Sequence, residues 1–467
     1  MTDIELSNDI KFELPEDVCS IIKTLEDAGF EAYAVGGCVR DMLLGKIPDD
    51  WDITTSARPL EVKALFKRTV DTGLQHGTVT VLMKNKGKLS GYEVTTYRID
   101  GDYSDGRHPD KVEFSSELSE DLKRRDFTIN AMAYHPERGL TDLFDGKADL
   151  EKKLIRCVGD AKERFSEDAL RMMRAVRFAA VLGGTIEAKT YEAIKALAGN
   201  LKNVSGERIR VETEKLLVSS HPYYFKQFYE TGLTAYFLPE FDICMNTAQE
   251  NIHHCYTVGE HLLHSLETID TVKLKKESGE DAYRRDLKIL RLTMLLHDIA
   301  KPAKKTVDES GVAHFKGHPA LGADMAEEIL TRLKYDNDTI RMVKGLVAAH
   351  ENRYEPAADV LRRAINRVGA EFFPLLFYVN EADTLAQSMY LRDEKLNRIA
   401  ALRRLYINIM EEGDCTDLKT LAVKGRDLIE RGISPGPEIG RILGEMLEDV
   451  LEEPAHNEKE YLLEKYI

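Results

Sequence analysis

The chain has 467 residues and a formal net charge of −16, which excludes a basic nucleic-acid coat protein and confines any surface for nucleic acid to part of the molecule. A hydrophobic fraction of 43% and a charged fraction of 31% are typical of a globular protein rather than a disordered or collagen-like one. No apolar run approaches the roughly 18 residues that span a bilayer, and the acidic N-terminus lacks the basic region of a secretory signal. We therefore expect a cytoplasmic protein with no membrane partner.

The first part of the chain alternates strand-like and helical runs. β-Branched and aromatic residues between Gly and Asp turns predict strands in EAYAVGG, WDITTSA, TVTVLMKN and GYEVTTYRI. The apolar spacing of VRDMLLG and PLEVKALF predicts helices. This alternation predicts an α+β head.

A glycine turn and three acidic residues stand out in this head. Gly36 and Gly37 precede a helical run, where backbone N–H groups can face a phosphate, although a plain strand-to-helix turn has the same pattern. Asp50 and Asp52 run into the strand-like ITT, and side chains two apart on a strand point to one face, as coordination of a hard cation requires. Glu93, on another predicted strand, would complete a Mg²⁺ site.

From about residue 147 onward the strand signals fade and helical periodicity dominates. In EDALRMMRAVRF, Asp168 and Arg171 are three apart on a predicted helix, about 60° around its axis. The carboxylate of Asp168 could then accept a hydrogen bond from a base while the guanidinium of Arg171 donates to the same edge. C and A offer the matching donors and acceptors, whereas U and G do not. Arg174 and Arg177 follow on the same helix. The alternative is an amphipathic helix with solvated arginines.

These motifs resemble known enzymes. GG-x-VRD-x-LLG followed by DWDITT is similar to the polymerase-beta-type nucleotidyltransferase superfamily. DLKRRDFTINAMA and EDALRMMRAVRF narrow the resemblance to the class II CCA-adding enzymes and the bacterial poly(A) polymerases. The resemblance runs from about residue 30 to residue 240 and resumes in the tail. It implies an α+β fold with a small mixed sheet in the head, followed by an all-helical remainder.

The resemblance also implies roles for individual residues. Asp50 and Asp52 match the ligands of Mg²⁺, and Glu93 matches the third catalytic carboxylate. The implied nucleotide-binding residues are Gly36, Gly37, Arg40, Arg125, Asp126, Asn130, Asp168, Arg171, Arg174 and Arg177. Within this set, Gly37 and Arg40 would contact the triphosphate, the RRD-x-x-x-N motif would position ribose and phosphates, and the last four would read the incoming base.

Histidines concentrate in one helical region, where seven of the thirteen lie between residues 253 and 318. His261, the dipeptide His297-Asp298 and the downstream Asp383 resemble the HD superfamily of metal-dependent phosphohydrolases. That resemblance implies a divalent transition metal on these four residues, since imidazoles and carboxylates suit such an ion.

Two more histidines extend this resemblance. His318 and His350 match those that some HD proteins use for a second metal, while His254 could contact phosphate, cap a helix or lie on the surface. An HD fold that has lost catalysis and acts as a spacer is the alternative. HD units are expected near the C-terminus, whereas this one precedes a family-like tail segment, and its charged segment 273–286 reads as an exposed linker.

Four segments are therefore expected: a head at 1–146, a neck that selects the base and binds RNA at 147–244, an HD domain at 245–395 and a tRNA-binding tail at 396–467. Residues 123–177 hold 13 Lys or Arg against 10 Asp or Glu, whereas residues 405–467 hold 7 against 15. The positive surface is thus expected in the head and neck.

We expect template-independent addition of CCA to tRNA from CTP and ATP, with a second phosphohydrolase activity. Poly(A) polymerase and A-only tRNA nucleotidyltransferase share every head motif and remain alternatives. From another class, a phosphohydrolase with an inactive RNA-binding head is also open. The Gly- and Asp-rich segment 100–114 is predicted to be the flexible loop that, in this family, serves the switch from C to A addition, which argues against CC-only addition.

Overall fold

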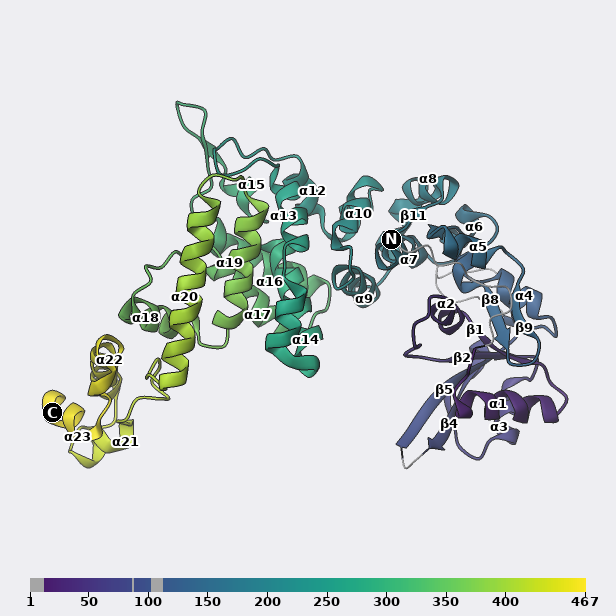
Figure 1. Cartoon of the computed structure of the whole chain (residues 1–467), viewed down its shortest axis with the longest axis horizontal. Coiled ribbons are helices and arrows are strands. Elements are labelled where there is room, and N and C mark those ends of the chain that lie inside the picture. The colour runs from purple at the N-terminus through teal and green to yellow at the C-terminus, as the bar shows by residue number, and fades with distance from the viewer. Residues whose placement is uncertain (1–11, 86–87, 102–111) are drawn as a thin grey trace. The chain divides into compact units, whose positions relative to one another are not determined.

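The structure is a computed structural model that describes residues 12–85, 88–101 and 112–467 (Figure 1). It forms two compact units, residues 1–237 and 238–467. The predicted flexible loop falls mostly on residues 102–111, which lie outside the described part. The strands on either side of it, β6 (Arg98–Asp100) and β7 (Val112–Phe114), pair with each other in antiparallel fashion.

A seven-stranded sheet of order β3-β4-β5-β2-β1-β8-β9 opens the first unit. Its strands are β1 (Ala32–Val35), β2 (Asp52–Thr55), β3 (Thr69–Gly73), β4 (Thr78–Asn85), β5 (Lys88–Thr96), β8 (Met132–His135) and β9 (Gly139–Asp142). The central pair β2 and β5 is parallel and the other neighbours are antiparallel. The predicted α+β head with a small mixed sheet is confirmed.

Helices cover this sheet because their apolar faces match it. Val18, Ile21 and Leu25 of α1 (Glu16–Asp27) share one core with Ile53 of β2 and Val94 of β5. The other head helices are α2 (Gly37–Leu43), α3 (Pro59–Leu65) and α4 (Leu118–Lys123). The apolar face of α1 thus packs against the central strands of the sheet.

The rest of the first unit is helical, except for the parallel pair β10 (Leu154–Ile155) and β11 (Thr185–Ile186). Its helices are α5 (Gly146–Glu151), α6 (Ala161–Glu167), α7 (Leu170–Leu182), α8 (Ala188–Leu197), α9 (Gly206–Leu217), α10 (Lys226–Glu230) and α11 (Thr234–Phe237). Met172, Val176 and Ala179 of α7 are fully buried, so this helix lies at the centre of the helical part of the first unit.

The second unit is built almost wholly from helices. These are α12 (Pro239–Met245), α13 (Val258–Glu267), α14 (Thr271–Leu296), α15 (Lys301–Lys304), α16 (His318–Arg332), α17 (Asn337–Ala349), α18 (Ala358–Val368), α19 (Phe373–Ala386), α20 (Arg392–Glu412), α21 (Gly425–Glu430), α22 (Pro437–Glu452) and α23 (Lys459–Tyr466). The two-residue strands β12 (Thr306–Val307) and β13 (Ala313–His314) pair in antiparallel fashion. Within the described residues, no helix combines the length and apolar character needed to cross a bilayer.

One expectation about this unit is wrong. The segment 273–286, predicted as an exposed linker, is helical and forms the first part of α14, which bends at Gly279 with φ +73°. The cause is burial on one side of the segment, because Leu274 is buried and Lys273 pairs with Glu381 of α19. The many charged residues on the exposed side of this helix made the segment look like a linker in the sequence.

Candidate functional site

Two predicted metal ligands face each other across the central strands of the head. Asp52 begins β2, and its partner in the parallel register is Glu93 of β5. Asp50 lies in a bend before β2 rather than on the strand, so the prediction that Asp50 and Asp52 share a strand face is wrong. The strand is shorter than its β-branched pattern suggested.

The three carboxylates nevertheless act on one another. Desolvation raises the pKa of Asp52, as does the charge of Asp50, while Arg125 opposes both. Desolvation, then Asp52, then Asp50 raise the pKa of Glu93. Carboxylates that disfavour one another's charge are a donor set that a hard divalent cation neutralises. The residues present therefore fit Mg²⁺.

The glycine turn lies beside an arginine of the RRD motif. Gly36 has φ +80°, and a Cβ there would lie 2.8 Å from Nη1 of Arg125. Gly37 starts α2 directly afterwards. Only glycine combines this left-handed backbone with so close an approach, so the turn brings backbone N–H groups and a guanidinium to the same place.

A chain of hydrogen bonds joins four of the remaining predicted nucleotide-binding residues: Arg40, Asn130, Asp126 and Arg174. Nη1 of Arg40 donates to Oδ1 of Asn130 at 2.7 Å, and Nδ2 of Asn130 donates to Asp126 at 3.2 Å. Arg174 completes the chain, because its Nε donates to Asp126 at 2.8 Å. Burial opposes the charge of Asp126, but Arg174 and Arg171 outweigh it and lower its pKa to about 2.

Asp121 is a buried residue that sequence reasoning did not single out. Its carboxylate accepts hydrogen bonds from Arg124 at 2.6 Å, from Arg125 at 3.2 Å and from the hydroxyl of Thr54 at 3.1 Å. Desolvation opposes the charge of Asp121, but the two arginines lower its pKa. Asp121 therefore positions Arg125 beside Gly36. Its spacing of four from Arg125 in a helical run was the available signal.

The predicted base-reading residues do not all lie on one helix. Asp168 lies between α6 and α7 with an extended backbone, so its predicted place on a helix with Arg171 is wrong. Its side chain forms a bidentate pair with Arg208 of α9. Arg171 pairs instead with Glu167. In the described structure, Asp168 and Arg171 therefore have different side-chain partners.

The other two arginines of α7 are held by a second residue of α9. Glu212 is 3% exposed, accepts a hydrogen bond from Nε of Arg177 and lies 3.7 Å from Nη1 of Arg174. Arg208 and Glu212 are four apart on α9, so both point toward α7. The sequence showed this spacing, but it could not show which helix α9 packs against.

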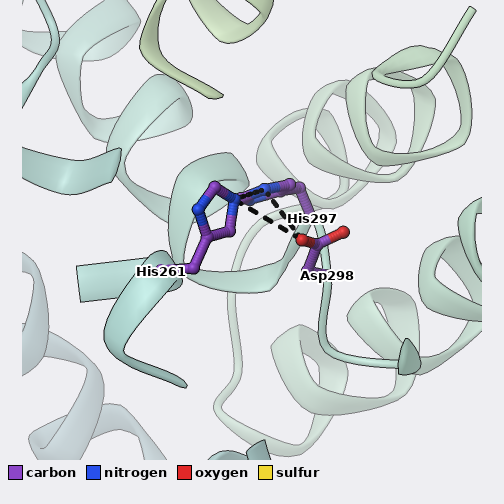
Figure 2. A group of neighbouring side chains, drawn as sticks. All are labelled: His261, His297 and Asp298. Atoms are coloured by element: carbon purple, nitrogen blue, oxygen red, sulfur yellow. Dashed lines mark hydrogen bonds and ion pairs between the residues drawn. The ribbon is translucent and has the colours of Figure 1, made fainter. Parts of the chain in front are cut away.

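Three predicted metal ligands converge in the second unit (Figure 2). Nε2 of His261 in α13 lies 3.2 Å from Nε2 of His297 and 3.5 Å from Oδ2 of Asp298. The fourth predicted ligand, Asp383 of α19, places Oδ1 3.0 Å from Nε2 of His261 and 3.7 Å from Nε2 of His297. The structure therefore brings all four together.

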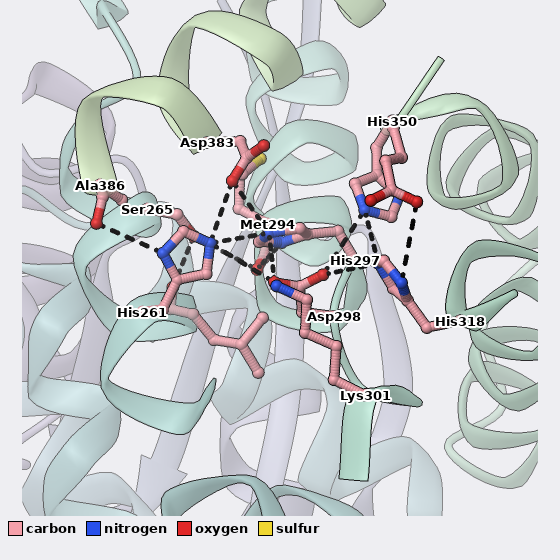
Figure 3. A network of polar contacts seen from close by, with 12 residues as sticks. His261, Ser265, Met294, His297, Asp298, Lys301, His318, His350, Asp383 and Ala386 are labelled. Atoms are coloured by element: carbon pink, nitrogen blue, oxygen red, sulfur yellow. Dashed lines mark hydrogen bonds and ion pairs between the residues drawn. The ribbon is translucent and has the colours of Figure 1, made fainter. Parts of the chain in front are cut away.

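The two additional histidines form a second group around the same aspartate. Oδ1 of Asp298 lies 3.0 Å from Nε2 of His318 and 3.5 Å from Nε2 of His350, and these two nitrogens are 3.2 Å apart. Figure 3 shows Asp298 between this group and His261. Asp298 thus offers one carboxylate oxygen to each group.

Backbone carbonyls orient all four imidazoles in the same way. Nδ1 of each ring lies within hydrogen-bond distance of a carbonyl: Ala386 for His261, Met294 for His297, Phe315 for His318 and Val347 for His350. A carbonyl only accepts, so Nδ1 carries the proton and a neutral ring presents its Nε2 lone pair to the centre.

The Nε2 lone pairs of the four histidines and the two carboxylates repel one another at these short distances, and a bound cation would relieve that repulsion. Each of the six residues is at most 4% exposed. Burial opposes the charge of Asp298, but the charge of Lys301 offsets it and holds the pKa of Asp298 well below the usual range. Imidazole nitrogens backed by carbonyls are the arrangement that divalent transition metals use. The residues present fit such a metal.

Two residues near this cluster were missed or left open. Nζ of Lys301 lies 2.7 Å from Oδ2 of Asp298, and its place one turn after the His-Asp dipeptide was the signal in the sequence. His254 packs its ring against His261 and approaches Lys301 at 3.4 Å. Burial, Lys301 and His261 lower the pKa of His254 to about 3, so its ring is neutral at pH 7.

Three family models match separate parts of the chain. The poly(A) polymerase head domain matches residues 32–156. The RNA and SrmB-binding site of polymerase A matches residues 184–245, and tRNA nucleotidyltransferase domain 2 matches residues 318–466. His318, His350 and Asp383 fall inside the third region, whereas His261, His297 and Asp298 lie between the second and the third.

Whole-length relatives are similar as well. A CCA-adding enzyme of Lactiplantibacillus plantarum is 37% identical over 95% of this chain and 94% of its own length. One of Leuconostoc mesenteroides is 57% identical over 44% of this chain and 52% of its own. The crystal structure of the Bacillus stearothermophilus CCA-adding enzyme in complex with CTP matches with a TM-score of 0.71 and 31% identity, over 97% of this chain and 98% of that one.

Proposed function

Because this chain belongs to the family of CCA-adding enzymes, we propose that it adds CCA to the 3′ end of tRNA from CTP and ATP without a nucleic-acid template. The observation that carries the proposal is the pairing of Asp52 with Glu93 on neighbouring strands, with Asp50 coupled to both and Arg125 at the glycine turn. This constellation offers a metal site and a phosphate site side by side.

In this proposal Asp50 and Asp52 hold Mg²⁺ and Glu93 is the third carboxylate of the site. Mg²⁺ would supply charge neutralisation for the triphosphate and for the attacking 3′ hydroxyl. The backbone N–H groups at Gly36 and Gly37, with Arg40 and Arg125, bind the phosphates. Asp126 and Asn130 position the ribose and also orient Arg40 and Arg174 through the hydrogen-bond chain.

Base selection is assigned to the junction of α6 and α7 with α9. Asp168 accepts from the exocyclic amino group of C or A, and Arg171 donates to the ring acceptors. Since these two side chains pair with Arg208 and Glu167, the incoming base exchanges with those partners. Arg174 and Arg177 are held by Glu212 and Asp126, and they shape the rim of the pocket.

Incubation of the purified protein with tRNA that lacks its CCA end tests this function. Addition of two C residues and one A is expected, and it requires both CTP and ATP. A long A tract on generic RNA would establish poly(A) polymerase instead. Extension of tRNA ending in CC, but not of tRNA lacking all three nucleotides, would establish an A-only enzyme.

We further propose that the histidine cluster is a metal-dependent phosphohydrolase centre within an HD domain at residues 245–395, between a neck at 147–244 and a tail at 396–467. It is supported by four Nε2 lone pairs and two buried carboxylates that converge on two adjacent points, with Asp298 shared between them. A divalent metal there would supply an activated water and polarise a phosphate ester. Lys301 lies where it can contact the phosphate.

Release of inorganic phosphate from nucleoside monophosphates tests this second activity. The Asp52→Asn background removes turnover by the head, so phosphate release in that background with Mn²⁺ supports the proposal. His297→Ala should abolish the release. Full activity of His297→Ala would mean that the hydrolysis takes place at another site. Absence of phosphate release by the protein with an intact cluster would mean that the HD domain acts only as a structural spacer.

A further inference from the structure

Four cationic side chains gather beside the histidine cluster on the side of Asp383. Arg353 follows α17, while Arg392, Lys395 and Arg398 lie on α20. Nη2 of Arg353 lies 3.8 Å from Oδ2 of Asp383. Desolvation lowers the pKa of Lys395, the charge of Asp383 opposes this, and the charges of Arg353, Arg398 and Arg392 add to the lowering. The four side chains therefore lie close enough to repel one another.

Of these four cations, Arg353 is the one with a carboxylate partner among the described residues, and that partner is Asp383. Among the described residues, neither Arg392, Lys395 nor Arg398 forms an ion pair with a carboxylate, and the buried Nε of Arg392 has no hydrogen-bond partner. By contrast, Arg403 on the same helix pairs with Glu277 and Glu381. Cations that are partly desolvated without a carboxylate favour an anionic ligand.

A small pocket lies beside these cations. Arg353, Lys395 and Arg398 line it together with Asn380 and Thr384, and much of the remaining lining is apolar: Leu361, Phe373, Leu376, Phe377, Ile399 and Leu402. Asn380 donates through Nδ2 to the carbonyl of the ligand residue His350 at 2.6 Å, and Arg353 donates to the same carbonyl at 3.1 Å. Lys395 reaches Asp383 through Gln387, whose Nε2 donates to Asp383 at 3.0 Å. The pocket therefore shares residues with the supports of both metal groups.

We propose that Arg353, Lys395 and Arg398 form an anion subsite that binds a second phosphate of the substrate, while the phosphate to be cleaved lies at the histidine cluster. The inference rests on the proposed phosphohydrolase function and deepens it. The preferred substrate is then a nucleoside phosphate with two separated phosphate groups, either a free nucleotide or the end of an RNA chain. A simple monophosphate ester fills the cluster but leaves the subsite empty.

A comparison of two substrates tests the subsite. Phosphate release from adenosine 3′,5′-bisphosphate and from p-nitrophenyl phosphate is measured with Mn²⁺ in the Asp52→Asn background. Arg398→Gln should lower the ratio of the two kcat/KM values about tenfold, as expected for loss of one charge-assisted hydrogen bond. Arg404→Gln is the matched control, because Arg404 is exposed on the same helix and should leave the ratio unchanged. An unchanged ratio in Arg398→Gln would overturn the subsite.

Binding separates this inference from the activity on which it rests. If neither substrate releases phosphate, the proposed phosphohydrolase function is wrong. The subsite can still be tested by calorimetry, which measures the affinity of the Mn²⁺-loaded protein for adenosine 3′,5′-bisphosphate. A weaker affinity in Arg398→Gln than in Arg404→Gln supports it, since any binding by the head is equal in both. Equal affinities overturn it. A short 3′-phosphorylated RNA in place of the bisphosphate then distinguishes a chain end from a free nucleotide.

Discussion

Arg208 holds the carboxylate of Asp168 through two parallel hydrogen bonds, from Nη1 to Oδ1 at 3.1 Å and from Nη2 to Oδ2 at 2.7 Å. This pair fixes the orientation of the acceptor that is proposed to read the incoming base. It also means that a base must compete with Arg208 for the same oxygens. Selectivity for C and A therefore depends on α9 as well as on the junction before α7.

Arg208→Gln is expected to reduce base selectivity more than it reduces folding. Loss of a bidentate partner leaves Asp168 free to rotate, and the preference for CTP over UTP should fall roughly tenfold, since one bidentate contact is worth about 1–3 kcal/mol of discrimination. Single-nucleotide incorporation assays measure the ratio of kcat/KM values. Lys215→Gln, an exposed substitution on the same helix, serves as the control, and equal ratios in the two variants would contradict the role of Arg208.

Asp52→Asn should abolish nucleotide addition while the protein remains folded. Removal of one carboxylate from the metal site is expected to lower the rate of CMP incorporation on the order of 10³-fold. The neighbouring Asp49 is exposed, so Asp49→Asn is a matched change of charge and should retain activity within about twofold of the wild type. Comparable losses in both variants would point to general electrostatics rather than to a metal site.

The ion pair of Asp126 with Arg174 should make the head sensitive to acid. A pKa of about 2 instead of the usual 3.8 corresponds to about 2 kcal/mol of stability. Because the folded-state pKa is lowered, this contribution is complete above pH 4 and is lost as the pH falls toward 2. Asp126→Asn should therefore be less stable than the wild type at pH 7, and the difference should shrink in that acid range.

Trp51 allows this measurement on the head alone, since it is the single tryptophan of the chain and is partly buried against the head core. Urea unfolding followed by its fluorescence at pH 7 and at pH 3 compares the two proteins. A stability difference that does not depend on pH would contradict the lowered pKa of Asp126.

Chelation should destabilise the second unit through the histidine cluster. Metal at about 100 times its Kd adds about 2.7 kcal/mol to folding, equivalent to a rise in Tm of roughly 5–10 °C for a unit of this size. Calorimetry with EDTA and then with Mn²⁺ measures the shift. His297→Ala should remove the dependence on metal, whereas His314→Gln, at an exposed position outside the cluster, should keep it. An equal response in both variants would rule out the cluster as the binding site.

Binding of tRNA should weaken steeply with salt despite the overall charge of −16. Contacts between Lys or Arg and phosphates release counterions, so the logarithm of the affinity falls linearly with the logarithm of the salt concentration. A titration from about 50 to about 200 mM salt, the range over which phosphate contacts lose much of their affinity, gives the slope. A nearly flat line would contradict an electrostatic surface in the head and neck.

Much of the head could be predicted from local sequence. The strands around Asp52 and Glu93 and the helix after Gly37 form where β-branched runs and glycine turns indicated them. Strands β3, β8 and β9 did not stand out, because segments such as GLTD lack β-branched runs and become strands only by pairing with neighbours. The linker expected within α14 failed for a related reason, since exposed charges hid the buried Leu274.

Residue chemistry and spacing in the sequence indicated the carboxylates of the head, and resemblance to known families indicated the RRD motif and the six metal-binding candidates of the second unit. These features depend on local order along the chain. Only the tertiary structure decided which residues of distant elements become partners. Examples are Arg208 with Asp168, Glu212 with Arg177, Asp298 between two histidine pairs, and the cations of α20 beside Asp383. Helix packing determines them, because a side chain's ionic partner depends on which faces meet in the folded core.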